Sequence, residues 1–403
     1  MRKLFYMGLE PYKARYTLQL TDWNVAVFDK RGIDYVVVPG QTLSSDQNIV
    51  TGQVLDAHGR TFYSLTQMAT LVKLMKEGHV TSEDVIYFED MYTSGIDSIP
   101  YILKQVPKEF RPKVYVRCLA QTIDPDDFLH VWDMQGFMKK YEQMVNEFVD
   151  GVLASNEEMV MHMKVAGWRA PIYNISGLAF GKNEVRSRID GEVRQFGERR
   201  MRVAFAARWD QEKQPDFYMD LIEEWYKRYP ETTPKVNDQG LLEGVEFVVL
   251  SGSKLRSNNQ NYEERTRRLV YEGKLVVHEN LEKNMYYTLL NDTRVLFNCA
   301  LQDWVSNTVS EADALGCNVL YPAYRSFPET FANDHERMYI PWSLDDAINK
   351  LHPLLMGQHG NMGKISDWTD GTIDRVCDIL EGKGDQWLRM TTDYRKHTRE
   401  AKY

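Results

Sequence analysis

Short apolar runs and longer amphipathic segments alternate along most of the chain. Continuous apolar runs predict buried strands of a parallel sheet, and apolar residues spaced three and four apart predict helices that cover the sheet. Alternating strands and helices therefore predict an α/β fold. In the first half we expect strands at 2–8, 35–38, 85–88, 113–117, 151–154 and 172–175, and helices near 16–27, 64–76, 99–105, 137–148 and 156–166.

The alternation is interrupted by the segment 184–200 and then begins again. This segment is rich in charge, contains glycine and has few apolar residues, which is typical of a linker. We therefore expect two doubly wound α/β domains, 1–183 and 201–371, separated by this linker, and a helical segment at 372–403. In the second half we expect strands at 202–207, 247–250, 275–277, 295–297, 338–340 and directly before Pro322, and helices from Pro215, near Ser306, at 344–355 and from Thr372.

The composition is that of a soluble globular protein, with 403 residues for two ordinary cores. The 58 acidic and 49 basic residues give a net charge of −9. This charge is unfavourable for non-specific nucleic-acid binding, although a local basic groove remains compatible with it. The N-terminus lacks an apolar signal-peptide core and no run of about 18 apolar residues occurs, so we expect a cytoplasmic protein without a membrane span.

The cysteines and histidines do not indicate a metal site. Cys118, Cys299, Cys317 and Cys377 show no metal-ligand spacing, and the nine histidines form no HExxH motif. We expect the cysteines to be reduced core residues and expect no metal.

The segment 303–322 combines a loop, a short helix and an apolar strand. Apolar residues fall on one side of the helix, and Asn307, Thr308 and Glu311 share the other, which leaves a polar side for a ligand. A helix that begins near Ser306 points unpaired N–H groups and the positive end of its dipole forward, an arrangement that suits a phosphate. As an alternative, Thr308 and Glu311 fit a capping box, in which Glu311 only stabilises the helix start.

Two cations, Arg208 and Lys213, follow the predicted strand 202–207 and precede the helix that starts with Pro215. Cations at the mouth of a strand, facing a helix N-terminus, are what neutralisation of a diphosphate requires. As an alternative, an arginine and a lysine at this spacing form an ordinary solvated pair.

Together these two elements resemble motifs of retaining GT-B glycosyltransferases. Asp303, seven intervening residues and Glu311 resemble their E-x7-E motif, with Asp at the first position, and the segment from Arg208 to Lys213 resembles their R-x4-K element without its flanking glycines. The resemblance implies two Rossmann-like domains that face each other across a cleft, and a C-terminal helix that returns to the first domain. It also implies that Glu311 holds the donor ribose and that Asp303 lies near the donor sugar.

Four further residues are candidates for donor binding. Gly8 follows the first strand, where its other role would be a tight turn. Ser251 and Gly252 follow the strand 247–250, in a turn suited to close approach of a ligand. The resemblance places the loop of His278 against the nucleotide base; as an alternative, His278 is a satisfied histidine at a strand end.

Carboxylates follow two strands of the first domain, at the sheet edge where parallel sheets bind ligands. Asp90 follows the strand 85–88, and Asp124, Asp126 and Asp127 follow the strand 113–117. The resemblance implies retention of anomeric configuration, which needs no general base. If the enzyme inverts, Asp90, Asp124 or Asp126 would take the acceptor proton. As an alternative, the Asp-Pro-Asp-Asp run is ordinary helix-start chemistry.

The reaction implied is transfer of a hexose or pentose from a nucleotide-diphosphate sugar, with UDP favoured, to an acceptor hydroxyl. Arg208 and Lys213 would stabilise the charge that builds on the leaving diphosphate, and backbone N–H groups at Ser306, Asn307 and Thr308 would add to this stabilisation. No cofactor beyond the nucleotide sugar is expected.

The motifs do not determine the identity of the acceptor. A looser resemblance of the segments 85–102, 123–129 and 149–178 to phage and viral glycosyltransferase-like proteins implies a hydroxymethylated pyrimidine in double-stranded DNA, modified in the host cytoplasm. Basic stretches at 104–113 and 182–200 are candidate DNA contacts, although such runs are also ordinary solvated faces. Small-molecule, lipid and glycan acceptors, and a non-enzymatic nucleotide-binding protein, stay as alternatives.

Overall fold

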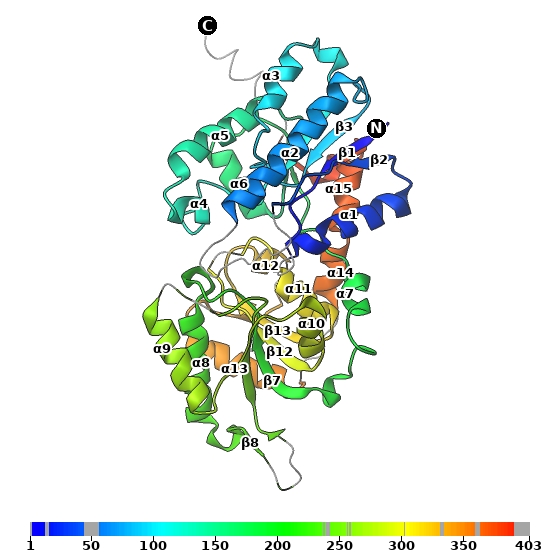
Figure 1. Cartoon of the computed structure of the whole chain (residues 1–403). Coiled ribbons are helices and arrows are strands. Elements are labelled where there is room, and N and C mark those ends of the chain that lie inside the picture. Colours follow the sequence, from blue (N-terminus) through cyan, green and yellow to red (C-terminus); the bar gives the residue numbers. More distant parts are fainter. Residues whose placement is uncertain are drawn as a thin grey trace. The chain divides into compact units, whose positions relative to one another are not determined.

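The computed structural model divides the chain into two compact units (Figure 1). Of the residues that the structure describes, unit 1 holds those up to Phe180 and those from Gly371 onward, and unit 2 holds those from Gly181 to Asp370. These breaks lie close to the predicted ones after 183 and 371. The structure describes residues 2–12, 16–43, 56–236, 238, 242–255, 257, 259–301, 303–330, 334–358 and 363–390.

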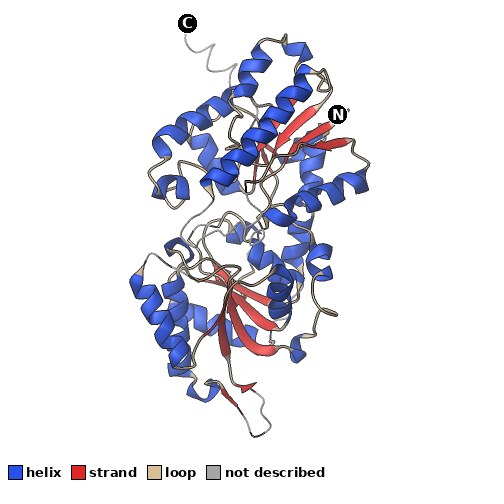
Figure 2. Ribbon diagram, in the orientation of Figure 1, coloured by secondary structure: helices blue, strands red, loops and turns tan. Residues whose placement is uncertain are grey.

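Unit 1 is built on a seven-stranded sheet in the order β15-β6-β5-β4-β3-β1-β2, flanked by helices (Figure 2). All neighbours are parallel except β15 and β6, which are antiparallel. Most of its central strands are buried on both faces, which explains their continuous apolar runs. The strands are β1 (Leu4–Met7), β2 (Tyr35–Val37), β3 (Val85–Phe88), β4 (Lys113–Arg117), β5 (Gly151–Ala154), β6 (Ile172–Asn174) and β15 (Leu388–Met390).

The helices of unit 1 follow the predicted positions, with α2 starting seven residues earlier, at Ala57 rather than Ser64. The Asp56 side chain explains this start, because it accepts hydrogen bonds from the backbone N–H groups of His58 and Gly59. The helices are α1 (Thr17–Arg31), α2 (Ala57–Lys76), α3 (Ser98–Lys104), α4 (Phe128–Val131), α5 (Gln135–Phe148), α6 (Glu157–Val165) and α15 (Thr372–Leu380), with 3-10 turns η1 (Lys108–Phe110) and η5 (Asp385–Trp387).

The C-terminal helix α15 returns to unit 1, as the resemblance implied. Arg31, in the last turn of α1, pairs with Asp374, Asp378 and Glu381. Arg375 donates hydrogen bonds to two backbone carbonyls that follow β6. The last element, β15, then extends the sheet beside β6.

Unit 2 is built on a six-stranded sheet, β11-β10-β7-β12-β13-β14, in which all pairs are parallel. A separate antiparallel hairpin is formed by β8 (Lys235–Val236) and β9 (Leu242–Glu243). The carboxyl ends of all six strands therefore share one edge of the sheet. The six strands are β7 (Arg200–Phe205), β10 (Glu246–Leu250), β11 (Val276–His278), β12 (Thr293–Phe297), β13 (Asn318–Pro322) and β14 (Met338–Tyr339).

Five helices of unit 2, α7, α9, α10, α12 and α14, were not expected from the sequence. The α9 sequence is so polar that only three of its residues, Tyr262, Thr266 and Leu269, are buried. The helices are α7 (Lys182–Ser187), α8 (Pro215–Arg228), α9 (Gln260–Tyr271), α10 (Lys283–Asn291), α11 (Asn307–Ala314), α12 (Phe327–Thr330), α13 (Leu344–Leu355) and α14 (Lys364–Asp370), with 3-10 turns η2 (Phe196–Glu198), η3 (Gln211–Lys213) and η4 (Pro230–Thr232).

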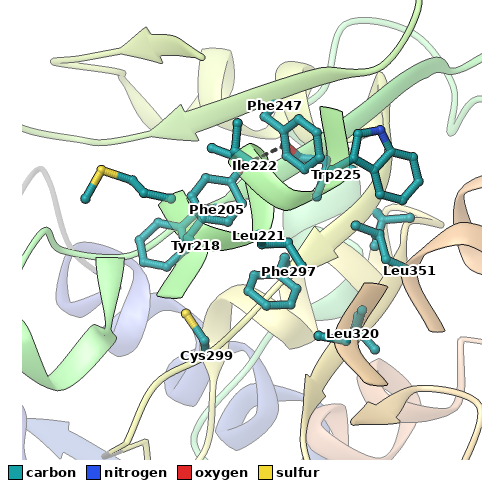
Figure 3. Close-up of a cluster of buried hydrophobic side chains, with 14 of the residues drawn as sticks. Phe205, Tyr218, Leu221, Ile222, Trp225, Phe247, Phe297, Cys299, Leu320 and Leu351 are labelled. Carbon is teal, nitrogen blue, oxygen red and sulfur yellow. Dashed lines mark hydrogen bonds between the residues drawn. The ribbon is translucent and has the colours of Figure 1, made fainter. Parts of the chain in front are cut away.

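The core of unit 2 is aromatic and lies between the sheet and helices α8 and α13 (Figure 3). Tyr218 of α8 stacks on Phe205 and Phe297, at ring-centroid distances of 5.0 and 5.8 Å. Its buried hydroxyl donates to the backbone carbonyls of Val203 and Val248, so the ring carries no unpaired polar atom into the core. This packing holds α8, and the loop before it, against the strands β7 and β12.

The segment 184–200 differs from the predicted linker, because it packs within unit 2. Val185 is completely buried. Arg199 is also buried, and its guanidinium donates to the backbone carbonyls of Thr293 and Leu315. A charge-rich segment can thus pack against a domain when backbone carbonyls accept hydrogen bonds from its buried arginine.

Candidate functional site

Backbone strain marks the carboxyl edge of the unit 2 sheet. Among the described residues of this unit, positive φ angles outside glycine occur at Gln214 (50°), Asn280 (55°), Arg325 (49°) and Trp342 (60°). Each lies in the loop that follows the carboxyl end of a strand, namely β7, β11, β13 and β14 respectively. Because such conformations cost energy and cluster where loops are shaped for a ligand, this edge is the candidate site.

The two sequence motifs meet at this edge. Lys213, at the end of η3, lies with its Nζ 3.7 Å from Asp303 Oδ1, as an ion pair rather than a direct hydrogen bond. The Asn298 side chain, directly after β12, donates to the other oxygen of Asp303 at 3.4 Å. The structure therefore brings together the R-x4-K and D-x7-E elements, which lie some ninety residues apart in the sequence.

A buried cysteine at the end of β12 fixes the Lys213 loop. The Cys299 thiol donates to the backbone carbonyls of Lys213 and Gln214, at 3.4 and 3.3 Å. Burial raises the pKa of this thiol well above its ordinary value, so it stays protonated and remains a donor. Cys299 is buried, as expected, and so are the other three cysteines.

Arg208 is engaged within its own loop. Its guanidinium pairs with Asp210, at 3.1 Å, and with Glu212. Its side chain is one-third exposed, whereas that of Lys213 is 12% exposed. Arg208 must exchange its two carboxylate partners to reach a bound anion, while Lys213 already lies at the edge of the sheet beside Asp303.

Helix α11 starts at this edge with unpaired amide groups. Ser306 is its N-cap, and the Ser306 hydroxyl bonds with Asn298 and Thr308 rather than with a backbone N–H of the first turn. Within the part of the chain that the structure describes, no acceptor is found for the backbone N–H of Asn307, Thr308 or Val309. These three N–H groups and the helix dipole form a site of positive potential that suits phosphate oxygens.

Glu311 occupies a different environment from the one expected. The expectation that it lies on a free polar face is wrong, since Glu311 is 1% exposed. Lys283 and Tyr287 donate to its Oε1, at 2.9 and 2.8 Å, and Tyr286 donates to its Oε2 at 3.0 Å. All three donors come from α10. The capping-box alternative is also wrong, because none of these bonds reaches back to the start of α11.

Ser251, Gly252 and His278 lie at the other end of this edge. The Ser251 hydroxyl donates to the Ser253 carbonyl at 2.8 Å, so it shapes its own turn, and Gly252 is exposed. The alternative was that His278 is a strand-end residue whose ring nitrogens are all hydrogen-bonded. This is not the case for Nε2, which is buried with no partner among the described residues. Burial, reinforced by the nearby Arg202 charge, lowers the pKa of His278.

This lowered pKa predicts how acid affects stability. A depressed histidine pKa means that the unfolded chain binds the proton more readily, so stability is lost as the pH falls below the unfolded value of about 6.5. We expect the melting temperature of wild type to fall more steeply between pH 7 and pH 5 than that of His278→Gln. Parallel curves for the two proteins would contradict this role of His278.

The candidates in unit 1 have structural partners. Gly8 is buried, and a Cβ there would lie 3.1 Å from both the Thr21 hydroxyl and the Tyr6 ring, so close packing rather than the suggested tight turn explains a glycine at this position. Asp90 is buried and pairs with Arg60. Burial raises the pKa of Asp90, and the Arg60 charge opposes that shift.

The Asp-Pro-Asp-Asp run forms the start of a helix. Asp127 is the N-cap of α4 and accepts from the Leu129 amide at 3.0 Å. Asp124 is completely buried and accepts from the Asp126 amide at 3.1 Å, while Asp126 itself is half-buried. The helix-start alternative is therefore confirmed for Asp127, and Asp124 lacks the exposure that a base for an acceptor hydroxyl needs.

Several residues of this site were missed in the sequence. Lys283, Tyr286 and Tyr287 surround Glu311, but they lie on a helix that was not predicted. Their spacing was a usable signal, because Lys283 and Tyr287 are four residues apart and lie on one side of a helix. Asn298 directly follows a strand, so it had the same positional signal as Asp90.

Comparison with known proteins rests on structure alone, because no family model and no curated protein matches the sequence. Sucrose-phosphate synthase from Thermosynechococcus elongatus is similar with a TM-score of 0.61, at 12% identity, over 99% of this chain and 100% of that one. Trehalose-6-phosphate synthase OtsA is similar with a TM-score of 0.62, at 10% identity, over 94% and 99%. Anabaena HepE, in complex with UDP and glucose, is similar with a TM-score of 0.57, at 12% identity, over 95% and 100%.

The chain has the GT-B fold. The similar structures cover nearly the whole chain, and their agreement with the two predominantly parallel sheets confirms the fold class predicted from the sequence. At 10–12% identity this structural similarity establishes the fold and does not by itself establish an enzymatic activity. Within the described residues of this GT-B chain, no helix is both long and apolar enough to cross a membrane.

Proposed function

We propose that this GT-B chain is a glycosyltransferase that moves a hexose or pentose from a UDP-sugar to an acceptor hydroxyl. The observation that carries the proposal is the meeting of Lys213 and Asp303 at the start of α11, where three backbone N–H groups are unpaired within the described structure. A cation and oriented amides at one sheet edge are the features that a diphosphate requires. Structures with this fold include complexes with UDP.

In the proposed mechanism the diphosphate binds between the η3 loop and the start of α11. Negative charge grows on its oxygens as the bond to the sugar breaks, and the Lys213 ammonium and the amides of Asn307 and Thr308 stabilise that charge. Asp303 keeps Lys213 in place before the donor binds. Arg208 adds a second cation if it leaves Asp210 and Glu212.

Glu311 is proposed to position the donor ribose. A carboxylate offers about four lone-pair sites, and α10 donors occupy three of them, so one remains for a ribose hydroxyl. Because Glu311 is deeply buried, the ribose would have to approach along Lys283, whose side chain is 16% exposed. This differs from a freely exposed ribose ligand and makes Lys283 part of the same site.

Retention of configuration is the favoured outcome, because two of the three carboxylates considered as bases are otherwise engaged. Asp90 is held by Arg60 and Asp124 is completely buried. A reaction with retention needs no such base.

A sugar or other small hydroxyl compound is the favoured acceptor. HepE was crystallised with UDP and glucose, and a trehalose-phosphate synthase from Burkholderia xenovorans with glucose-6-phosphate. The argument for a hydroxymethylated DNA base is weakened, because several cations of the basic stretch 182–200 already pair with acidic residues of the same unit. Lys182 pairs with Asp367, and Arg194 pairs with Asp292.

Duplex DNA as the acceptor makes a separate prediction about salt. Binding to DNA weakens linearly with the logarithm of the salt concentration, in proportion to the phosphates contacted. We expect no salt-dependent binding of hydroxymethylated duplex DNA, measured by fluorescence anisotropy from low to physiological ionic strength. Tight binding with a steep salt dependence would contradict the sugar acceptor and favour DNA.

The proposed function is tested by donor binding and turnover. UDP should bind in calorimetric titration, and a panel of UDP-sugars should release UDP slowly in water and faster with a sugar acceptor. A non-enzymatic nucleotide-binding protein would bind UDP without releasing it from any UDP-sugar. A protein that does not bind UDP would overturn the proposal.

A further inference from the structure

An exposed aromatic surface lies at the β13–β14 end of the same sheet edge. Trp342, in the loop after β14, is 58% exposed. Tyr324, in the loop after β13, packs edge-on against it, with ring centroids 5.5 Å apart at 63°. We call these two residues the aromatic platform. A large aromatic side chain exposed beside a candidate site is a feature of ligand-binding surfaces.

The aromatic platform is held rigid at a cost in backbone energy. Trp342 and Arg325 both have left-handed φ angles, and so does Gln214, which contacts the platform. With its amide oriented to satisfy both neighbours, Gln214 accepts a hydrogen bond from Trp342 Nε1 at 2.9 Å and donates to the Cys299 carbonyl at 2.9 Å. Since left-handed conformations of such residues are unfavourable, their concentration around one exposed indole indicates a surface shaped in advance for a ligand.

The aromatic platform is tied to the Lys213–Asp303 pair from both sides. Gln214 directly follows Lys213 and bonds to Trp342. On the other side, Ser326 donates to the Asp303 carbonyl at 2.9 Å. The Arg325 guanidinium lies over the Tyr324 ring, with Cζ 5.6 Å from its centroid, and over Trp304.

The order of strands decides which part of a ligand reaches the aromatic platform. The sheet runs β11-β10-β7-β12-β13-β14. The proposed diphosphate lies at the ends of β7 and β12, and the His278 loop, which the GT-B resemblance places against the nucleotide base, follows β11 at one border. The platform follows β13 and β14, on the opposite side of the diphosphate from the base. A group bound there is a sugar rather than the nucleoside.

We propose that Trp342 and Tyr324 form a subsite that packs against the face of a pyranose ring. The C–H groups on one face of a pyranose are apolar, and an exposed aromatic ring removes them from water while the hydroxyls at the ring edge remain solvated. The pyranose comes either from the donor, as the transferred sugar, or from a sugar acceptor. This inference rests on the proposed function and assigns it two residues that neither motif contains.

The test compares two substitutions of Trp342 with a control in the same unit. Trp342→Ala removes the ring, and Trp342→Phe keeps a ring but loses the bond to Gln214. Trp368→Ala, on α14, removes an indole that is similarly exposed, at 48%. Each protein is titrated calorimetrically with UDP, with UDP-glucose, UDP-galactose and UDP-N-acetylglucosamine, and, when saturated with UDP, with glucose and glucose-6-phosphate.

We expect Trp342→Ala to bind UDP as wild type does but to bind one class of sugar ligand about tenfold more weakly, the size of effect that a lost ring contact produces. A loss confined to UDP-sugars identifies the transferred sugar, and a loss confined to glucose or glucose-6-phosphate identifies the acceptor. Trp342→Phe should retain most of the affinity, and Trp368→Ala all of it.

Two results would overturn the subsite. Sugar affinities of Trp342→Ala equal to those of wild type would exclude contact with the ring. Equal weakening of UDP and of the sugar ligands would place the effect on the loop rather than on a sugar. A wild-type protein that binds no UDP would instead overturn the proposed function itself, and the subsite with it.

Discussion

Lys213→Ala should lower kcat/KM for UDP-sugar turnover by an amount equivalent to about 2–4 kcal/mol of transition-state stabilisation. This is the size of effect seen when one preorganised donor to a developing charge is lost. This corresponds to a loss of about 30- to 1,000-fold. The reason is the position of the Lys213 ammonium, which Asp303 and the Cys299-supported loop hold at the sheet edge beside the start of α11. Steady-state kinetics with a UDP-sugar and a sugar acceptor provide the measurement.

The matched control for Lys213→Ala is Lys227→Ala. Lys227 belongs to the same unit, but its side chain is 75% exposed and pairs with Glu224 one turn earlier on the same helix. It should therefore leave kcat/KM unchanged. In Lys213→Ala the affinity for the UDP-sugar should fall less than kcat/KM, because the leaving diphosphate carries more charge in the transition state than in the bound donor. Normal turnover by Lys213→Ala would remove the diphosphate assignment of this loop.

Glu311→Gln should weaken UDP binding about tenfold and lower the free energy of unfolding by about 2 kcal/mol. The carboxylate makes charge-assisted hydrogen bonds, each worth roughly 1.5–3 kcal/mol, to the proposed ribose and to the donors of α10, and the substitution weakens both sets. The neutral amide is a poorer acceptor for Lys283 and turns one of its ends into a donor that faces tyrosine hydroxyls. Calorimetric titration with UDP and denaturant unfolding without ligand measure the two effects separately.

Lys283→Met distinguishes a ribose role of Glu311 from a purely structural one. This substitution removes the ion pair and keeps both the carboxylate and the two tyrosine donors. It should lower stability much as Glu311→Gln does, while UDP affinity is kept or improved, because an additional carboxylate lone pair becomes available. If Lys283→Met loses as much UDP affinity as Glu311→Gln, the carboxylate acts by holding α10 against α11 and does not bind the ribose.

The difference between the two Glu311 alternatives shows where sequence reasoning reaches its limit. Spacing alone placed Glu311 on the polar side of a short helix and left a capping box open. Whether that side faces solvent depends on which helix packs against it, and α10 had only a weak pattern in the sequence. Burial of a charged group is therefore decided by long-range packing rather than by the periodicity of its own helix.

The sequence by itself determined the α/β class and the positions of most strands, because strands that are buried on both faces leave continuous apolar runs. It also determined the two motifs, because their residues follow such runs directly or closely. These residues are Arg208, Lys213, Asp303 and Glu311. Only the tertiary structure decided that Lys213 meets Asp303 and that the charged segment 184–200 packs within unit 2. The tertiary structure alone also showed that Trp342 is exposed at the sheet edge where the Lys213–Asp303 pair lies. The physical reason is that parallel strands distant in sequence end at one edge. Which loops meet there, and which charges find carbonyl or carboxylate partners, follows from the strand order and not from local spacing.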